Sequence, residues 1–468
     1  MQIPILNGVY TDGDSDFRVS YPFNMVPVPI GQGISNGYLR PAEGITAMGG
    51  SGPGRSRDAI NWDGVCYRVM GPDLVKISAD GDISTIGKVD DNGSFAALDY
   101  SFDHLGAVSD GRFFLYDKTT FSEVIDPDLG IVFDFIWVDG YFMLTDGEFL
   151  IVTELDDPFS INPLKYGSSE ADPDPIKAVL KLRNEPYALN RYTIEVFDNV
   201  GGTGFPFQRI DGAQVQRGTV GTRACCIFLE SVAFLGGGRE ESISVWLAAS
   251  GSSARIATRE IDLVLSRYNE QILSAVLMES RVDKGHQYLY IHLPDQTLVY
   301  DANASQAVGE PVWFILGSGL ARNTGYRAVD MVWCYDKWLV GDSVSSAVGF
   351  LDHSSTDHWG SVVGWEFNTV IIYNEGRGSI FHELELVALS GRIELGLEDS
   401  VATQYSLDGE FWSQLRHIKS AKTGRRNKRL VWLNQGDMRH WRIQRFSGTS
   451  KSKLSIARLE ARVEPLGV

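Results

Sequence analysis

The feature that most constrains the fold is a repeated pair of short strand-like runs closed by a tight turn, found between residues 64 and 352. In one example, Tyr67-Arg-Val-Met turns through Gly71-Pro-Asp73 into Leu74-Val-Lys-Ile. Turn residues between aromatic and β-branched runs are typical of β-hairpins. The pattern recurs at six further hairpin centres: Asp110-Gly111, Asp139-Gly140, Asn190, residues 236–238, Pro294-Asp295 and Asp336-Lys337.

Seven hairpin centres at intervals of roughly 30 to 50 residues fit the length of a four-stranded propeller blade. Many short strands are also favoured by composition, since 49 of the 468 residues are Gly and 52 are Trp, Tyr or Phe. We therefore expect an all-β protein in which residues 46–355 form a β-propeller of six or seven blades. Radial repetition favours this fold because it leaves few sheet edges exposed.

One segment departs from the strand pattern. Residues 258–268 place Ile261, Val264, Leu265 and Tyr268 on one face of a helix. Residues 274–279 are consistent with a second helical turn. We expect one inserted helix near residues 258–268 that packs against the propeller, with docking of a partner protein as the alternative.

The two ends of the chain differ from the middle. Residues 1–45 contain too many Pro and Gly residues for a helical period, which predicts an extended N-terminal arm that wraps its own domain or reaches a neighbour. After a polar linker at residues 353–360, longer runs alternate apolar and polar residues, and one of them lies at residues 392–397. This alternation predicts an antiparallel β-sandwich over residues 356–468.

Charge is divided unevenly along the chain, whose net charge is −18. Residues 401–468 contain 14 basic and 5 acidic residues, a net charge of +9, which leaves −27 for residues 1–400. Seven basic residues gather in one loop region of the expected sandwich: Arg416, Lys419, Lys422, Arg425, Arg426, Lys428 and Arg429. We predict that they form a protein interface, with a solvated loop as the alternative. Nucleic-acid recognition is disfavoured because no aromatic residues lie among them at stacking spacing.

No motif predicts catalysis, because the chain lacks a Gly-x-Ser-x-Gly elbow, a P-loop and a His-Glu-x-x-His helix. Asp12, Asp14 and Asp16 alternate as in a calcium loop, but Phe17 stands where that loop needs Gly, so a structural loop is expected. Residues 406–412 partly resemble the Asp-box of sialidase-type propellers. They lie outside the expected propeller, where a hairpin turn of the sandwich is the simpler interpretation.

The four cysteines, Cys66, Cys225, Cys226 and Cys334, have neither Cys-x-x-Cys nor His-containing ligand spacing, so zinc and disulfides are not indicated. We expect no catalytic residues, no cofactor and no metal site. The N-terminus lacks a signal-peptide pattern and no run reaches 18 apolar residues, so we expect synthesis in the cytosol and no membrane.

Five stretches carry a family resemblance: residues 35–46, 67–70, 192–197, 258–268 and 280–306. The most specific part is Ile291-His-Leu-Pro together with Val299-Tyr-Asp-Ala. These stretches resemble the packaged-DNA stabilisation proteins, also called tail hubs, tail accessory factors or nozzles, of short-tailed bacteriophages of the Salmonella podovirus type. The resemblance covers most of residues 20–350, and beyond them mainly residues 406–412.

The resemblance implies a structural virion protein of the tail, without catalytic residues, that is made in the host cytoplasm and assembles as a hexameric ring below the portal and adaptor. It implies that the ring extends the DNA channel, retains packaged DNA and docks the tailspike and the tail needle. Double-stranded DNA would slide through without specific binding, because acidic walls repel phosphates. Two alternatives remain: a carbohydrate-binding or carbohydrate-cleaving propeller of a phage tail, and a cytosolic propeller adaptor.

Overall fold

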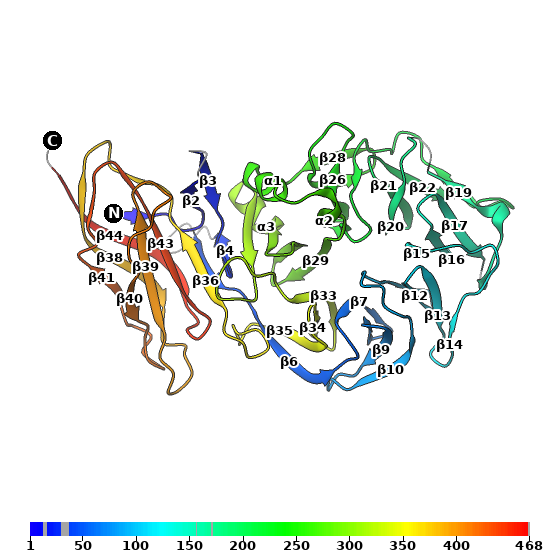
Figure 1. Cartoon of the computed structure of the whole chain (residues 1–468), viewed down its shortest axis with the longest axis horizontal. Helices are drawn as coiled ribbons and strands as arrows, with labels where there is room; N and C mark the ends of the chain where they lie inside the picture. The colour runs from blue at the N-terminus through cyan, green and yellow to red at the C-terminus, as the bar shows by residue number, and fades with distance from the viewer. Residues whose placement is uncertain (13–15, 30–36, 156, 170–171, 467–468) are drawn as a thin grey trace.

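The computed structural model of the chain describes residues 1–12, 16–29, 37–155, 157–169 and 172–466. In these residues a ring of seven small antiparallel sheets lies beside a two-sheet sandwich, with one further hairpin between them (Figure 1). The prediction of an all-β protein with a propeller and a C-terminal sandwich is confirmed. The described ring has seven blades, the upper of the two numbers expected.

The first four blades follow one another along the chain, each with its earliest strand innermost. Blade 1 consists of β7 (Ser56–Trp62), β8 (Val65–Met70), β9 (Asp73–Ile77) and β10 (Ile83–Lys88). Blade 2 consists of β11 (Ala97–Tyr100), β12 (Leu105–Ser109), β13 (Arg112–Tyr116) and β14 (Phe121–Glu123). Blade 3 consists of β15 (Asp134–Val138), β16 (Tyr141–Thr145), β17 (Phe149–Glu154), β18 (Asp157–Ile161) and β19 (Gly167–Ser168), with the 3₁₀ turn η1 (Pro163–Lys165). Blade 4 consists of β20 (Ile176–Leu182), β21 (Glu185–Asn190), β22 (Ile194–Asn199) and β23 (Phe207–Arg209).

The last three blades complete the ring. Blade 5 consists of β24 (Gly218–Thr219), β25 (Cys225–Phe228), β26 (Ser231–Gly237), β27 (Ser244–Ala249) and β28 (Ser252–Arg255). Blade 6 consists of β29 (Leu277–Asp283), β30 (His286–His292), β31 (Thr297–Asp301) and β32 (Val312–Leu316). Blade 7 consists of β33 (Ala328–Cys334), β34 (Lys337–Asp342), β35 (Ala347–Asp352) and β6 (Gly44–Ser51).

Blade 7 closes the ring with a strand from the other end of the propeller sequence. β6 pairs antiparallel with β35, so that Ile45 lies opposite Leu351. The innermost strand of blade 7, β33, in turn lies beside β7 of blade 1. Since the two ends of the propeller sequence are held in one sheet, the blades cannot separate without breaking these hydrogen bonds.

Two-residue turns join the first two long strands in six of the seven described blades. Both residues of each turn have positive φ, the geometry that matches the twist of the flanking strands. The turns are Asp63-Gly64, Asp139-Gly140, Arg183-Asn184, Leu229-Glu230, Lys284-Gly285 and Tyr335-Asp336.

The described residues contain three short α-helices, whereas the sequence predicts one. α1 (Arg259–Leu265) is the predicted helix; Thr258 caps it, and Ile261, Val264 and Leu265 are buried. α2 (Glu270–Ser274) follows it, and the expected turn at 274–279 is instead largely the start of β29. α3 (Ala302–Val308) lies between β31 and β32, and Gly309 ends it in the left-handed region.

The sandwich has two antiparallel sheets around one apolar core. The first sheet contains β1 (Gln2–Ile3), β4 (Met25–Pro29), β5 (Gly37–Pro41), β38 (Ser379–Leu389), β41 (Leu430–Leu433), β42 (Asp437–Met438) and β44 (Ser455–Pro465). The second sheet contains β36 (Gly364–Asn368), β37 (Ile372–Tyr373), β39 (Ser400–Ser406), β40 (Arg416–Lys419) and β43 (Trp441–Thr449).

The N-terminal residues expected to form an extended arm are distributed over the whole molecule. β1, β4 and β5 join the first sandwich sheet, in which β4 is an edge strand. Pro27 and Pro29 suit that edge, because proline has no N–H to donate to a further strand. β2 (Gly8–Thr11) and β3 (Phe17–Ser20) form a separate hairpin, called here the arm hairpin. The N-terminal region therefore connects the sandwich to the propeller.

Candidate functional site

The seven predicted basic residues lie in one region of the sandwich, where the chain crosses from one sheet to the other. Arg416 and Lys419 belong to β40 of the second sheet. The loop that follows carries Lys422, Arg425 and Arg426 and leads to β41 of the first sheet. Lys428 and Arg429 immediately precede β41. The structure thus gathers six of the seven residues around this crossing, whereas Arg416 lies at the far end of β40, beside Asn434.

Four of these residues are engaged within the sandwich. Arg429 forms ion pairs with Glu383, at 3.0 Å, and with Glu385. Lys419 pairs with Glu398 at 2.6 Å. Each arginine or lysine lowers the pKa of its carboxylate partner, Glu385 or Glu398, because it donates a hydrogen bond to the charged form. Arg416 and Lys428 donate to the main-chain carbonyls of Asn434 and Lys419 respectively. These four cations therefore hold loops and strands of the sandwich together.

The other three, Lys422, Arg425 and Arg426, have exposed side chains with no hydrogen bond or ion pair from those side chains in the described part of the chain. Leu395 and Leu397, which are 90% and 42% exposed, lie in the neighbouring loop. Leu397, Lys422 and Arg425 line a shared hollow of about 110 Å³. We call these five residues the basic tip. The basic tip thus combines exposed leucines with cations whose side chains are not engaged within the sandwich.

Sequence reasoning missed the two leucines because residues 392–397 were expected to form a strand. That expectation is wrong: the segment is a loop, and β39 begins only at Ser400. Gly391 and Gly396 adopt positive φ values of 80° and 87°, which take the backbone out of the extended conformation. The alternation of apolar residues therefore does not continue into a sheet here.

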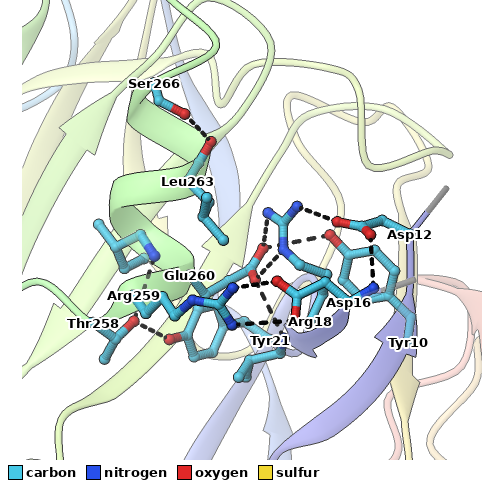
Figure 2. A network of polar contacts seen from close by, with 12 residues as sticks. Tyr10, Asp12, Asp16, Arg18, Tyr21, Thr258, Arg259, Glu260, Leu263 and Ser266 are labelled. Carbon is cyan, nitrogen blue, oxygen red and sulfur yellow. Dashed lines mark hydrogen bonds and ion pairs between the residues drawn. The ribbon is translucent and has the colours of Figure 1, made fainter. Parts of the chain in front are cut away.

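A second polar site holds the arm hairpin against the propeller (Figure 2). Arg18 donates two hydrogen bonds to the carboxylate of Glu260 on α1, from Nε at 2.7 Å and from Nη2 at 2.8 Å. Both side chains are more than nine-tenths buried. The hydrogen bonds that Arg18 donates to Glu260 raise the pKa of Arg18 above its ordinary value, and Asp12 also accepts from Arg18, at 3.0 Å. This buried bidentate pair is the centre of the contact.

Exposed and half-buried contacts surround that pair. Arg259 forms an ion pair with Asp16, and both side chains are exposed to solvent. The hydroxyl oxygen of Tyr21 lies 2.5 Å from Oγ1 of Thr258, the capping residue of α1. Burial raises the pKa of the Tyr21 hydroxyl to about 12. Of the carboxylates that alternate as in a calcium loop, Asp12 and Asp16 thus contact arginines, and Asp14 lies outside the described residues.

The same hairpin also contacts the sandwich. Thr11 donates to the main-chain carbonyl of Asp408 at 2.6 Å, and a Cβ on Gly409 would lie 2.3 Å from the Thr11 hydroxyl oxygen. Asp408 accepts from the N–H groups of Glu410 and Phe411, so residues 406–412 form a loop after β39 in the sandwich. The arm hairpin thus contacts both the propeller and the sandwich and joins the two.

Carboxylates form a third polar site, at the junctions between blades around the propeller axis. In each case a side chain on one innermost strand accepts a main-chain N–H from the next innermost strand, at 2.6 to 2.9 Å. The pairs are Asp58 with Leu98, Asp99 with Trp137, Asp134 with Val179 and Glu279 with Met331. Some of the acidic residues that make the propeller negative are therefore buried at the blade junctions and do not contribute to its surface.

An ion pair crosses the axis itself. Arg223 precedes β25 of blade 5, and its Nη2 lies 2.7 Å from Oδ1 of Asp58 on blade 1, across the ring. Asp330 lies nearby on blade 7 and is almost fully buried. Burial raises the pKa of Asp330, and the neighbouring Asp58 raises it further. This ion pair places side chains from opposite sides of the ring across the axis of the propeller.

Two further features bear on function class. The four cysteines are free thiols, and all but Cys226, which is half-buried, are buried. None of the helices in the described residues is both long and apolar enough to cross a membrane.

Comparison with known proteins identifies the family. A family model described as bacteriophage P22 Gp10, beta-propeller, matches residues 1–356, and a second, described as bacteriophage P22 Gp10, beta-sandwich, matches residues 364–464. The chain belongs to the bacteriophage P22 Gp10 family. Within it, the chain is 26% identical over 479 aligned residues to the tail hub protein gp10 of Salmonella phage P22, and the alignment covers 99% of each chain.

Some solved structures are similar in part. The N-terminal domain of Nup159 has a TM-score of 0.42 at 8% identity, covering 70% of this chain and 98% of its own. The WD40 domain of Pan2 from Neurospora crassa has a TM-score of 0.40 at 9% identity, covering 67% of this chain and 95% of its own. We infer nothing about function from similarities this low.

Proposed function

We propose that this protein is the tail hub of a short-tailed bacteriophage. In this proposal it is made in the host cytoplasm, assembles as a hexameric ring below the portal and adaptor, extends the DNA channel and retains packaged DNA. The observation that carries the proposal is the 26% identity to the P22 tail hub protein over 99% of both chains. A match along both folds supports a shared overall role and not only a shared domain.

The basic tip is the surface that we propose for docking. Residues 1–400 carry a net charge of −27 and residues 401–468 carry +9. Opposite potentials favour encounter and orient partners, and apolar residues supply contact area once they meet. Lys422, Arg425 and Arg426 would therefore contact an acidic surface of a neighbouring subunit or of another tail protein, among which tailspike and needle are expected partners.

The propeller axis bears on where DNA would pass. The ion pair between Arg223 and Asp58 joins opposite sides of the ring. A DNA channel would thus be built between subunits and not through one propeller. Acidic walls suit such a channel, because like charges prevent the phosphate binding that retards sliding.

We propose no enzymatic role. A tail protein that binds or cleaves carbohydrate remains the alternative, and incubation with polysaccharide from the host surface tests it by the release of reducing ends. A cytosolic propeller adaptor is the other alternative. It requires that the purified protein does not join tail-less phage heads that carry portal and adaptor.

The assembly experiment uses such heads together with the full chain. The triple variant Lys422→Ser, Arg425→Ser and Arg426→Ser should fold normally, because none of these side chains has a partner in the described residues. We expect it to form rings or to join heads more slowly and less completely than the unmodified chain. A control with the same change in charge replaces three exposed cations of the propeller, Lys76, Arg183 and Lys337, by serine; the ion pair that Arg183 forms with Glu230 is exposed, so its loss should cost little.

The two parts of the proposal are separable in this experiment. If the unmodified chain joins heads and the triple variant joins them equally well, the basic tip is not the docking surface and the tail hub role stands. If the unmodified chain does not join heads or retain DNA in them, the tail hub role itself is contradicted.

A further inference from the structure

Three possible metal ligands meet where the propeller, the N-terminal region and the start of the sandwich connection come together. Glu43 lies between β5 and β6, Asp283 ends β29 of blade 6, and His353 follows β35 of blade 7. One ligand atom from each of the three lies within 4.8 Å of the others. We call these three residues the junction triad.

The distances in the junction triad match the spacing of ligands around a shared metal ion. Nε2 of His353 lies 3.2 Å from Oε1 of Glu43 and 3.2 Å from Oδ2 of Asp283, and it is also within a long hydrogen-bond distance, 3.3 Å, of Oδ1 of Asp283. Charge-assisted hydrogen bonds are shorter, about 2.7 to 2.9 Å. Two ligands held about 2.0 to 2.2 Å from one tetrahedral ion lie about 3.3 Å apart, close to the separations observed here.

The carboxylate oxygens also lack other partners. The Glu43 side chain is only 6% exposed, yet its Oε1 accepts no hydrogen bond. Oδ2 of Asp283 is likewise buried without a hydrogen bond. Both oxygens face Nε2 of His353 at 3.2 Å, and a cation held between the three side chains would satisfy both of them at once.

Nearby cations shape the site without filling it. Nη2 of Arg281 lies 2.7 Å from Oε2 of Glu43, so that oxygen is engaged and Oε1 remains for the ion. Nη1 of Arg40 is 4.0 Å from Oε1. Lys453, which faces His353 from the sandwich, donates to the main-chain carbonyl of His353 and does not compete for its ring.

Space for a fourth ligand is present. A hollow of about 350 Å³ adjoins the triad and is lined by Glu43 and His353, together with Lys284 and His286 from blade 6. Water from this hollow can complete a tetrahedron. One imidazole and two carboxylates are a donor set that takes zinc and similar divalent transition ions.

We propose that the junction triad binds one divalent transition-metal ion, with Zn²⁺ as the reference ion, through Glu43 Oε1, Asp283 Oδ2 and His353 Nε2. The ion ties the segment before β6 to blade 6 and to the start of the connection to the sandwich. Its role is structural, since it fixes the orientation of the sandwich relative to the propeller.

The test uses the full chain stripped of metal with a chelator. Titration with ZnCl₂ in a calorimeter should show one ion per chain, and added Zn²⁺ should raise the melting temperature, because an ion that binds only the folded state stabilises it. Co²⁺ should give the visible absorption bands of a tetrahedral site. His353→Gln and, separately, Glu43→Gln should each weaken binding by about 100-fold or more.

The matched control is His382→Gln, in which an exposed histidine paired with Glu464 in the sandwich is replaced. It should leave metal binding unchanged. If the unmodified chain shows neither Zn²⁺ binding nor a tetrahedral Co²⁺ spectrum, the proposal is overturned, and His353 contacts the two carboxylates directly without an ion between them. Triad variants that bind Zn²⁺ as tightly as the unmodified chain does would also overturn it. The Co²⁺ spectrum of the unmodified chain decides the matter even if the variants fail to fold.

Discussion

At the scale of single residues, the carboxylates at the blade junctions balance two effects. Each accepts a main-chain N–H that would otherwise be unpaired, which stabilises the junction. Each is also removed from water, which disfavours its charged form. For Asp134 the second effect dominates, since burial raises its pKa from 3.8 to about 7 despite the hydrogen bond from Val179.

The first prediction concerns Asp134. Between pH 4 and pH 7 the folded protein keeps a proton that the unfolded chain has released, so the contribution of Asp134 to stability is greatest at low pH and falls as the pH rises through about 7. Asp134→Asn keeps an acceptor for Val179 and stays neutral. The difference in the free energy of unfolding between the variant and the unmodified chain should shift by about 2 to 4 kcal/mol in favour of the variant as the pH rises from 5 to 8.

Melting temperatures of the two proteins at each pH provide the measurement. The comparison cancels the opposite effect of His358, whose pKa burial lowers to about 3 and whose contribution is lost as the pH falls below about 6.5. A difference between variant and unmodified chain that does not change with pH would show that Asp134 is ionised at pH 5 or stays protonated at pH 8.

The buried pair of Arg18 and Glu260 gives the second prediction. Replacing either residue alone leaves its partner charged and buried, which costs about 3 to 5 kcal/mol. In Arg18→Met, the arm hairpin should therefore leave α1, and amide exchange in β2 and β3 should become faster. The double variant Arg18→Met and Glu260→Leu should recover much of the protection, because neither member of the buried pair is left charged without the other; Asp12, which also loses Arg18, is partly exposed to water.

An exposed pair in the same contact is the control. Arg259 and Asp16 are solvent-exposed, and such pairs contribute at most about 1 kcal/mol. Arg259→Ala should leave amide exchange of the hairpin nearly unchanged. Equal effects of the Arg18 and Arg259 variants would mean that the buried pair does not hold the hairpin.

At the scale of elements, the ring depends on one strand that is remote from the rest of its blade. β6 supplies the outer strand of blade 7, and Ile45 on it is 1% exposed. Loss of β6 exposes the edge of β35 and breaks the link between the first and last parts of the propeller.

The third prediction follows from this closure. A chain that begins at residue 52 should lack a cooperative thermal transition of the propeller and should be cut rapidly by protease. A chain that begins at residue 22 lacks β1 and the arm hairpin but keeps β4, β5 and β6. It should retain the propeller transition. If both truncated chains melt alike, closure by β6 is not what stabilises the ring.

The sequence predicts elements where local chemistry determines them. The pair Asp139-Gly140 predicts a hairpin, because both residues tolerate positive φ. Leu229-Glu230 forms the same kind of turn in blade 5 with residues that seldom adopt it, so the strands around it must impose the geometry. The sequence did not predict α3, because a helix of seven residues with one capping aspartate shows little periodicity of apolar residues.

At the scale of the whole molecule, composition predicts the class of fold but not the contacts between distant segments. The basic residues of the tip are adjacent in sequence and could be predicted, whereas Leu397 joins them only because its loop lies beside theirs. Glu43, Asp283 and His353 are separated by 240 and 70 residues. No ligand spacing exists for a site that arises only when the ring closes.

The division of charge between propeller and sandwich gives the last prediction. If the basic tip meets an acidic surface, long-range attraction should speed encounter, and salt should slow it because ions screen charges beyond about 10 Å at 0.1 M. The rate at which the unmodified chain joins heads should therefore fall as the salt concentration rises. The triple variant Lys422→Ser, Arg425→Ser and Arg426→Ser should join more slowly and with a weaker dependence on salt, whereas the control variant of Lys76, Arg183 and Lys337 should keep the full dependence.

Joining rates measured by light scattering over a series of salt concentrations distinguish the two variants. A triple variant with the full salt dependence would mean that attraction arises elsewhere on the molecule, and the basic tip would then contribute contact area without steering the encounter.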